Sequence, residues 1–336
     1  MKLGILTVGH IHTPNFIRRL QERPEIQVAG VYDPNPKLAA KCAGELNAPV
    51  VDTAAKILND KSIDAVAILG TTVQHDDLIV PAALAGKHMF AEKPLAVTGP
   101  QANRMFRAIK DSGVTFQTGH FMRSNPKYRF MKQELDAVNL GTVTRVRGSN
   151  CHCGALAGWF DTDYRWFFDI TQAGGGGFYD LGCHTLDIMT YLFGPVASAT
   201  GAIGGQTIKY PNIDEYGEAL LRFANGITGT LAAGWVDRRN PNEFEICGTE
   251  GHLQIHNGVV LYQSSKSKVP GADGSKPIDT KDMPAALPHA FDLFFDVLLG
   301  KASKADLVPV EEALHVSKAM EAIYLGDKIG SWVKVV

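Results

Sequence analysis

Two short segments of the chain carry side chains that can act on a hydroxyl group. In Glu92-Lys93-Pro94 a lysine follows an apolar run, and a glycine run from Gly174 to Gly177 leads into Asp180 and His184. Side chains four residues apart lie on one face of a helix, so Asp180 and His184 are neighbours if this segment is helical. Histidine titrates near neutral pH, and a lysine cation stabilises a developing alkoxide. These residue types indicate an enzyme that holds a hydroxyl group and removes its proton.

The elements that must position these side chains differ between the two halves of the chain. The first 120 residues alternate between apolar runs and helical patterns, which is typical of a doubly wound α/β sheet. We predict strands at 3–8, 27–32, 49–51, 65–69, 89–91 and 115–118, and helices at 14–21, 54–59, 78–85 and 100–111. The run Ala65 to Leu69 is entirely apolar, as expected for a buried strand of a parallel sheet. Residues 1–120 are therefore predicted to form one α/β domain.

After residue 120 the runs become strand-like and are separated by tight turns. We predict strands at 142–148, 218–223, 227–233, 244–247, 252–255 and 259–262. Turns at 224–226 and 248–251 suit antiparallel hairpins, residues 264–284 suit an exposed loop, and residues 311–325 suit a helix. Residues 121–336 are therefore predicted to form a second α/β domain with a large, mostly antiparallel open sheet.

A glycine loop after the first strand and an acid after the second strand form the layout of a dinucleotide-binding Rossmann domain. Gly9 is the one glycine kept from the G-x-G-x-x-G pattern, and His12 stands where the third glycine is expected. Thr13 as N-cap and Pro14 as the first helical residue predict a helix that starts slightly later. Asp33, 24 residues after Gly9, stands where an acid binds the ribose hydroxyls. Taken alone, the loop also fits an ordinary turn between a strand and a helix.

The choice between NAD and NADP follows from the charge near Asp33. A carboxylate at this position repels the 2′-phosphate of NADP, and no arginine follows in Pro34-Asn35-Pro36. NAD is therefore favoured over NADP.

The overall composition argues against several classes of partner. The net charge is −2 and there is no basic run, which argues against nucleic acid. No apolar stretch reaches the length that spans a bilayer, and the chain begins directly with a strand rather than with a signal peptide. Five scattered cysteines do not form a disulfide framework, so we expect the protein in the cytoplasm.

The motifs together resemble one known family. The glycine loop with Asp33, then Glu92-Lys93-Pro94, then the glycine run with Asp180 and His184 follow the order found in the Gfo/Idh/MocA oxidoreductases, such as glucose-fructose oxidoreductase and inositol dehydrogenase. The resemblance covers nearly the whole chain, and the glycine loop is its chief departure. It implies NAD(P)-dependent transfer of hydride between a nicotinamide cofactor and a secondary carbinol of a sugar, polyol or inositol.

The same resemblance implies roles for individual residues. Lys93 would contact the reacting hydroxyl, Asp180 would orient the substrate, and His184 would be the acid/base. The residues expected to bind the cofactor are Gly9, His10, Ile11, His12, Asp33, Thr71, Thr72, His75, Glu92 and Lys93. The residues expected to bind the substrate are Lys93, Arg123, Trp166, Asp180 and His184. A sheet with one uncovered face also favours subunit contacts, so we expect a homodimer or homotetramer.

Several of these residues also have a structural interpretation. Lys93 could be a solvated surface lysine, Asp180 and His184 a hydrogen-bonded pair within one helix, and Arg123 a member of an ion pair. Three tryptophans either supply flat apolar surface for a sugar ring or pack in the core, namely Trp159, Trp166 and Trp235.

Potential metal ligands occur at two places, but neither fits a known site. His10 and His12 form one group, and Cys151-His152-Cys153 forms another. A zinc site normally needs two close pairs of ligands at characteristic spacing, and this sequence does not provide them. No metal is predicted.

Two functions besides that of a dehydrogenase are also compatible with the motifs. An enzyme with retained NAD could oxidise a sugar carbon, eliminate a neighbouring group and reduce again, without net redox. A non-catalytic NAD sensor would not need Lys93, Asp180 and His184 together, so their presence argues against it.

Overall fold

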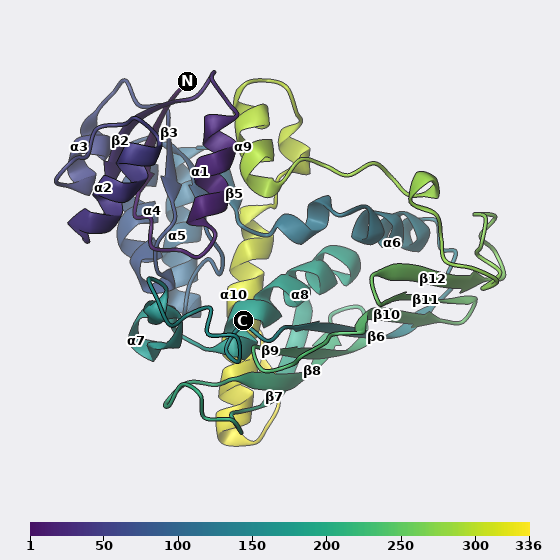
Figure 1. The fold of residues 1–336 in the computed structure, drawn as a ribbon. Helices are drawn as coiled ribbons and strands as arrows, with labels where there is room; N and C mark the ends of the chain where they lie inside the picture. Colours follow the sequence, from purple (N-terminus) through teal and green to yellow (C-terminus); the bar gives the residue numbers. More distant parts are fainter. The chain divides into compact units, whose positions relative to one another are not determined.

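The computed structural model describes all 336 residues, which fold into two compact units (Figure 1). The first unit contains Met1–Gly119, Phe160–Gly174 and His289–Ser317. The second contains His120–Trp159, Gly175–Pro288 and Lys318–Val336. Two segments from the range that the sequence prediction assigned to a second domain, Phe160–Gly174 and His289–Ser317, thus fold with the first unit.

The first unit is built on a parallel five-stranded sheet with the order β2-β1-β3-β4-β5. Its strands are β1 (Lys2–Leu6), β2 (Gln27–Tyr32), β3 (Ala65–Ile68), β4 (His88–Ala91) and β5 (Phe116–Thr118). Every residue of β3 is fully buried, as its apolar sequence predicts. The predicted strand at 49–51 was wrong as a strand, since only a single parallel bridge joins Val50 to Val31. Pro49 lacks the N–H that a longer ladder requires there.

The first unit also contains helices, most of which pack beside this sheet (Figure 1). They are α1 (Thr13–Gln21), α2 (Pro36–Glu45), α3 (Ala54–Asn59), α4 (His75–Leu84), α5 (Gly99–Ser112), α7 (Ile170–Ala173) and α9 (Ala290–Leu298), with short 3₁₀ turns η1 (Thr72–Gln74), η3 (Arg165–Phe168) and η5 (Lys304–Asp306). The sequence prediction had no element at α2 or α9. Asn35, whose side chain accepts the backbone N–H of Lys37, is the N-cap signal that identifies α2.

The second unit is built on an eight-stranded sheet with the order β12-β11-β10-β6-β9-β8-β7-β13. Its strands are β6 (Val143–Cys151), β7 (Val196–Gly204), β8 (Tyr216–Phe223), β9 (Thr228–Gly234), β10 (Asn242–Gly248), β11 (Gly251–His256), β12 (Val259–Ser264) and β13 (Val333–Lys334). Only β6 and β9 pair in parallel, so the prediction of a mostly antiparallel sheet is confirmed.

One face of the eight-stranded sheet is packed against helices. Tyr128 of α6 (Pro126–Asp136) lies against Phe244 of β10, with ring centroids 5.8 Å apart. Gly182 of α8 (Gly177–Phe193) faces Leu231 and Ala233 of β9. Helix α10 (Val310–Ile329) contributes its second half to this unit, and two further 3₁₀ turns are η2 (Phe121–Ser124) and η4 (Thr280–Asp282). No helix of the protein combines the length and apolar character needed to cross a bilayer. None of the five cysteines forms a disulfide bond.

Candidate functional site

The glycine loop joins β1 to α1 at the carboxyl end of the parallel sheet, where open α/β sheets bind ligands. A Cβ added to Gly9 would meet no atom within 4 Å, so the backbone here is open to a close neighbour such as a pyrophosphate. His12, rather than the predicted Thr13, is the N-cap of α1. The helix begins here because the His12 carbonyl already accepts the N–H groups of Asn15 and Phe16, at 2.9 and 3.2 Å.

Asp33 lies between the ends of the first two strands. One of its carboxylate oxygens accepts the Val8 N–H at 2.8 Å, and the other accepts the Asn35 N–H at 2.7 Å. Burial raises the pKa of this carboxyl group, because its effect is larger than that of the two N–H donors, which lower the pKa. The carboxylate is thus fixed beside the glycine loop, where the sequence analysis expected an acid that binds ribose hydroxyls.

Glu92 brings the two histidines of the glycine loop together with the end of β4. Its carboxylate is buried, with one oxygen 2.9 Å from His12 Nδ1 and 3.7 Å from His10 Nδ1. The other oxygen accepts the Lys93 backbone N–H at 2.8 Å. Burial alone would raise the pKa of Glu92, but His10, His12 and Lys93 hold it well below its usual value. Glu92 is therefore an ionised, buried counter-charge next to the loop.

His10, His12 and Glu92 are also the residues of the first unit that can hold a metal ion. One ligand atom from each lies within 4.8 Å of the other two. Sequence spacing could not indicate this group, because Glu92 is 80 residues away from His12 in the chain. The structure also brings together Glu245, Cys247 and His252 in the second unit.

The loop after β3 contacts the loop after β1. A Cβ on Gly70 would lie 2.3 Å from Thr7 Oγ1, so a glycine is required where the two loops meet. Thr71 and Gln74 form a capping box around η1. His75 is buried, and its Nδ1 lies 3.1 Å from the Leu95 carbonyl, two residues after Lys93. Burial lowers the pKa of His75, so it is a neutral support for the Lys93 segment.

The segment Phe160–Gly174, here called the strap, holds the glycine loop from the other half of the sequence. The indole N–H of Trp166 donates to the Gly9 carbonyl at 2.8 Å. Phe167 stacks on Trp166 at 4.0 Å between centroids and lies 5.3 Å from the His10 ring. The sequence analysis expected Trp166 among the substrate-binding residues, and the structure shows its indole N–H bound to the glycine loop.

The glycine run of the second unit permits an unusually close backbone approach to α8. Cβ atoms on Gly176 and Gly177 would lie 2.0 and 2.3 Å from the carbonyl oxygens of Asp214 and Glu215. The Asp214 carboxylate accepts the N–H groups of Gly176 and Phe178 at 2.8 and 2.9 Å. Asp214 therefore caps the N-terminus of α8, a role that the sequence analysis missed because no fixed spacing links it to the glycines.

Asp180 and His184 lie on the first two turns of α8, as the sequence predicted. One Asp180 oxygen accepts the indole N–H of Trp235 at 3.0 Å. His184 is buried, with the ring centroids of Phe121 and His120 at 5.1 and 6.0 Å. Lys93, 3 % exposed, belongs to the first unit, so the predicted catalytic set is divided between the two units.

Arg123 forms a bidentate ion pair with Asp187 of α8. Its Nε donates to one Asp187 oxygen at 2.9 Å, and a terminal N–H group donates to the other at 2.5 Å. Asp187 is fully buried, and the guanidinium also lies over the Tyr191 ring, 5.1 Å from its centroid. Of the two interpretations of Arg123, this geometry matches the structural ion pair.

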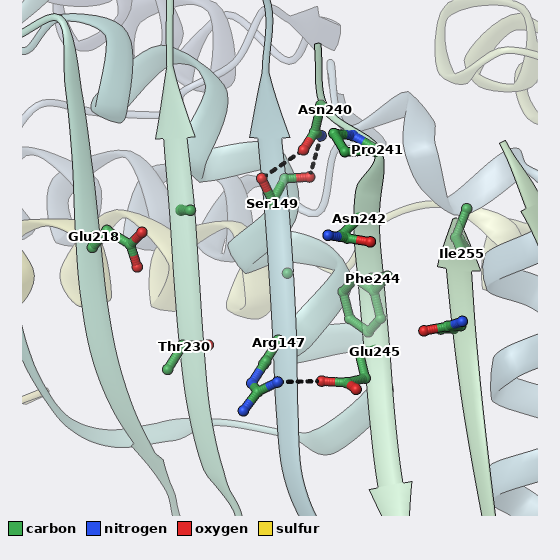
Figure 2. Close-up of a pocket in the computed structure, with 13 residues that line it drawn as sticks. Arg147, Ser149, Glu218, Thr230, Asn240, Pro241, Asn242, Phe244, Glu245 and Ile255 are labelled. Atoms are coloured by element: carbon green, nitrogen blue, oxygen red, sulfur yellow. Dashed lines mark hydrogen bonds and ion pairs between the residues drawn. The ribbon is translucent and has the colours of Figure 1, made fainter. Parts of the chain in front are cut away.

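The outer face of the eight-stranded sheet contains a hollow of about 410 Å³ (Figure 2). An Arg147–Glu245 ion pair of 2.9 Å lies on its floor, and the Ser149 hydroxyl donates to the Asn240 side-chain oxygen at 2.7 Å (Figure 2). None of the predicted site residues lines this hollow.

Comparison with known proteins identifies both halves of the chain. The family model described as "Oxidoreductase family, NAD-binding Rossmann fold" matches residues 1–120, and the model of the GFO/IDH/MocA C-terminal domain matches residues 128–254.

Two curated relatives act on cyclic compounds. The NAD(+)-dependent scyllo-inositol 2-dehydrogenase of Bacillus subtilis is 30% identical over 272 residues, which cover 78% of this chain and 74% of that protein. The levoglucosan dehydrogenase of Pseudarthrobacter phenanthrenivorans is 29% identical over 251 residues, covering 66% of this chain and 63% of that protein.

Other comparisons concern the range of reactions and the fold. The 2,7-anhydro-N-acetylneuraminate hydratase of Escherichia coli is 25% identical over 258 residues, covering 75% of this chain and 66% of that protein. Among solved structures, a levoglucosan dehydrogenase in complex with NADH has a TM-score of 0.80 at 22% identity and covers 100% of this chain and 99% of its own. At this identity the structural match establishes the fold alone.

Proposed function

Since the chain belongs to the GFO/IDH/MocA family of oxidoreductases and is an NAD-dependent dehydrogenase, we propose that it transfers hydride between NAD and a secondary carbinol of a cyclic polyol or sugar. The observation that carries this proposal is the placement of Asp180 and His184 on adjacent turns of α8, with Lys93 buried at the end of a Rossmann strand. The substrate class is supported by the relatives that act on scyllo-inositol and levoglucosan.

The cofactor fits the residues around the glycine loop. The open side of Gly9 leaves room for the pyrophosphate, and the α1 N-terminus favours its negative charge. The fixed carboxylate of Asp33 would accept hydrogen bonds from the ribose hydroxyls. When bound, NAD supplies the hydride chemistry, and the protein supplies placement and charge.

The chain's own residues would handle the proton. His184 would take the hydroxyl proton, because an imidazole titrates near neutral pH. The Lys93 ammonium would stabilise the oxygen as negative charge develops on it. Asp180 would accept a hydrogen bond from a substrate hydroxyl and so select the orientation in which the reacting carbon is presented.

A spectrophotometric screen tests this proposal. Wild-type protein is incubated with NAD and with scyllo-inositol, myo-inositol, levoglucosan or D-glucose, and absorbance at the reduced nicotinamide band is followed. We expect reduction with at least one of these compounds and none with Lys93→Met, which keeps the side-chain length but removes the charge. Thr144→Val, on an exposed strand position away from the predicted site, is the matched control and should behave as wild type. No reduction across the panel, or full activity of Lys93→Met, would reject the assignment.

A redox-neutral reaction with retained NAD is a second candidate. The strap holds the glycine loop through the 2.8 Å bond from Trp166 to Gly9, which would slow release of a nucleotide bound there. One relative is named a hydratase, and hydration involves no net redox change. Purified protein that releases stoichiometric nucleotide on denaturation, yet does not reduce added NAD, would favour this candidate.

We also propose that the outer face of the eight-stranded sheet forms the subunit contact of a homodimer or homotetramer. This face contains the hollow of Figure 2. Successive side chains of each strand point alternately toward this face and toward the helix-covered face. Ala232→Arg, in the central strand β9, should dissociate the oligomer, whereas Leu84→Arg, at an exposed position of α4, should not. Light scattering after size exclusion measures both, and an unchanged mass of Ala232→Arg would contradict the assignment.

A further inference from the structure

We propose that Trp235 is a positioning residue, whose indole N–H fixes the Asp180 carboxylate in the orientation that receives the substrate. The inference rests on the proposed function, because it assigns Trp235 a role through Asp180. The sequence analysis allowed Trp235 a place in the core or against a sugar ring, and the structure places it in the core with its indole N–H on Asp180. Its ring is fully buried, and its one polar atom lies 3.0 Å from an Asp180 oxygen.

Trp235 is held rigidly enough to act in this way. It directly follows β9, and its backbone N–H donates to the Glu215 carbonyl at 2.8 Å. Its carbonyl accepts the Ala155 N–H at 3.1 Å. The backbone is thus anchored on both sides, so the indole has little freedom to follow a moving carboxylate. The fixed indole N–H therefore determines the position of the Asp180 carboxylate, and the carboxylate does not determine the position of the indole.

The direction of the bond matters for the chemistry. Indole offers a donor and no acceptor, so it can stabilise only the ionised or accepting form of Asp180. A buried indole N–H requires a partner, and a carboxylate in the first turn of α8 also benefits from the helix N-terminus. Both effects favour the carboxylate form of Asp180, whose oxygens accept hydrogen bonds from hydroxyl groups.

The glycine run explains how an indole can reach this helix. A Cβ on Gly177 would lie 3.1 Å from the Trp235 backbone nitrogen and 2.3 Å from the Glu215 carbonyl oxygen. Only a glycine at this position lets the end of β9 lie against the first turn of α8. Gly177 therefore serves the Trp235–Asp180 contact, while the backbone N–H of Gly176 serves the cap that Asp214 provides.

Trp235→Phe tests the proposal, since it removes the N–H group and keeps an aromatic ring. On whichever compound of the four-member panel the wild type oxidises, we expect kcat/KM to fall about 10- to 100-fold, the loss typical of a hydrogen bond to a charged group. Below the acid limb that the proposed base His184 sets, activity should fall more steeply with falling pH than in the wild type, because a carboxylate that loses a donor is protonated more easily. The Kd for NAD should not change. Trp332→Phe, in which an exposed ring that lies over the Arg222 guanidinium is replaced, is the matched control and should match the wild type in all three quantities.

A double-mutant cycle separates positioning from simple packing. The free energy of unfolding is measured for wild type, Trp235→Phe, Asp180→Ala and the double variant, and we expect the two effects to be non-additive. Trp235→Tyr replaces Trp235→Phe if the latter does not fold. Additive effects, or a Trp235→Phe variant with unchanged kcat/KM and pH profile, would overturn the inference while leaving the proposed function in place. A wild type that oxidises none of the four compounds would overturn both.

Discussion

Gly177 and Gly182 lie on the same helix, yet replacing each with alanine should have opposite results. A Cβ on Gly177 would lie 2.3 Å from the Glu215 carbonyl oxygen, which is backbone and cannot rotate away. Ordinary contact begins near 3.4 Å, so about 1 Å of backbone movement is needed. A Cβ on Gly182 would meet only Met320 Cε at 3.5 Å and Ala233 Cβ at 3.6 Å, which is ordinary contact.

The magnitudes follow from these distances. Overpacking in Gly177→Ala should cost about 1–3 kcal/mol, partly offset by about 1 kcal/mol from the better helix propensity of alanine. Gly182→Ala has the better helix propensity of alanine and no steric clash, so its free energy of unfolding should be unchanged or higher by up to about 1 kcal/mol. A displacement near 1 Å at the start of α8 would also move Asp180, which should lower kcat/KM by about 100-fold.

The assay compares the two variants with the wild type by urea unfolding and by steady-state kinetics on the compound that the screen identifies. We expect Gly177→Ala to lose both stability and activity, and Gly182→Ala to keep both. Equal stability and equal activity of the two variants would refute the claim that the glycine run exists for close backbone approach.

Three further predictions concern the ion pairs and the strap. Glu92→Gln should lower stability at pH 7 by about 1–3 kcal/mol. The pKa of Glu92 is lower in the folded than in the unfolded protein, so its contribution to stability is present above the unfolded pKa and is lost as the pH falls through the folded pKa. The difference in urea midpoint between Glu92→Gln and the wild type should therefore shrink in acid. A difference that stays constant with pH would contradict this prediction. Trp166→Phe should raise the Kd for NAD by about 2- to 10-fold in calorimetry, since it removes the hydrogen bond to Gly9, and Trp159→Phe should not. Arg123→Lys should lower the free energy of unfolding by about 2–4 kcal/mol without raising KM. A raised KM at unchanged stability would instead indicate that Arg123 binds the substrate.

Local patterns were sufficient to predict most of the fold. Apolar runs such as Ala65 to Leu69 and turns such as Ala224-Asn225-Gly226 indicated the parallel and antiparallel sheets, because periodicity and turn chemistry are local properties. The assignment of Phe160–Gly174 and His289–Ser317 to the first unit was missed, since it depends on packing between residues far apart in sequence. The loss of the strand at 49–51 came from the missing N–H of Pro49.

The candidate site shows the same division. Asp180 and His184 were predictable from their spacing on one helix. The contacts of Trp235 with Asp180, of Asp214 with the start of α8 and of Asp187 with Arg123 were not, because each joins α8 to a residue far away in the sequence and follows no fixed spacing. Glu92 was expected near the cofactor, but its pairing with His12 is visible only in the structure.

The most direct test of the central claim is to follow the hydrogen on the reacting carbon. Wild-type protein is incubated with NAD and with carbon-deuterated scyllo-inositol, myo-inositol or levoglucosan, and the nucleotide is analysed by mass spectrometry. We predict that one of these compounds yields reduced cofactor one mass unit heavier than NADH, and that Lys93→Met and His184→Ala yield none. Absence of deuterated cofactor with every compound, or its formation by Lys93→Met, would contradict the account.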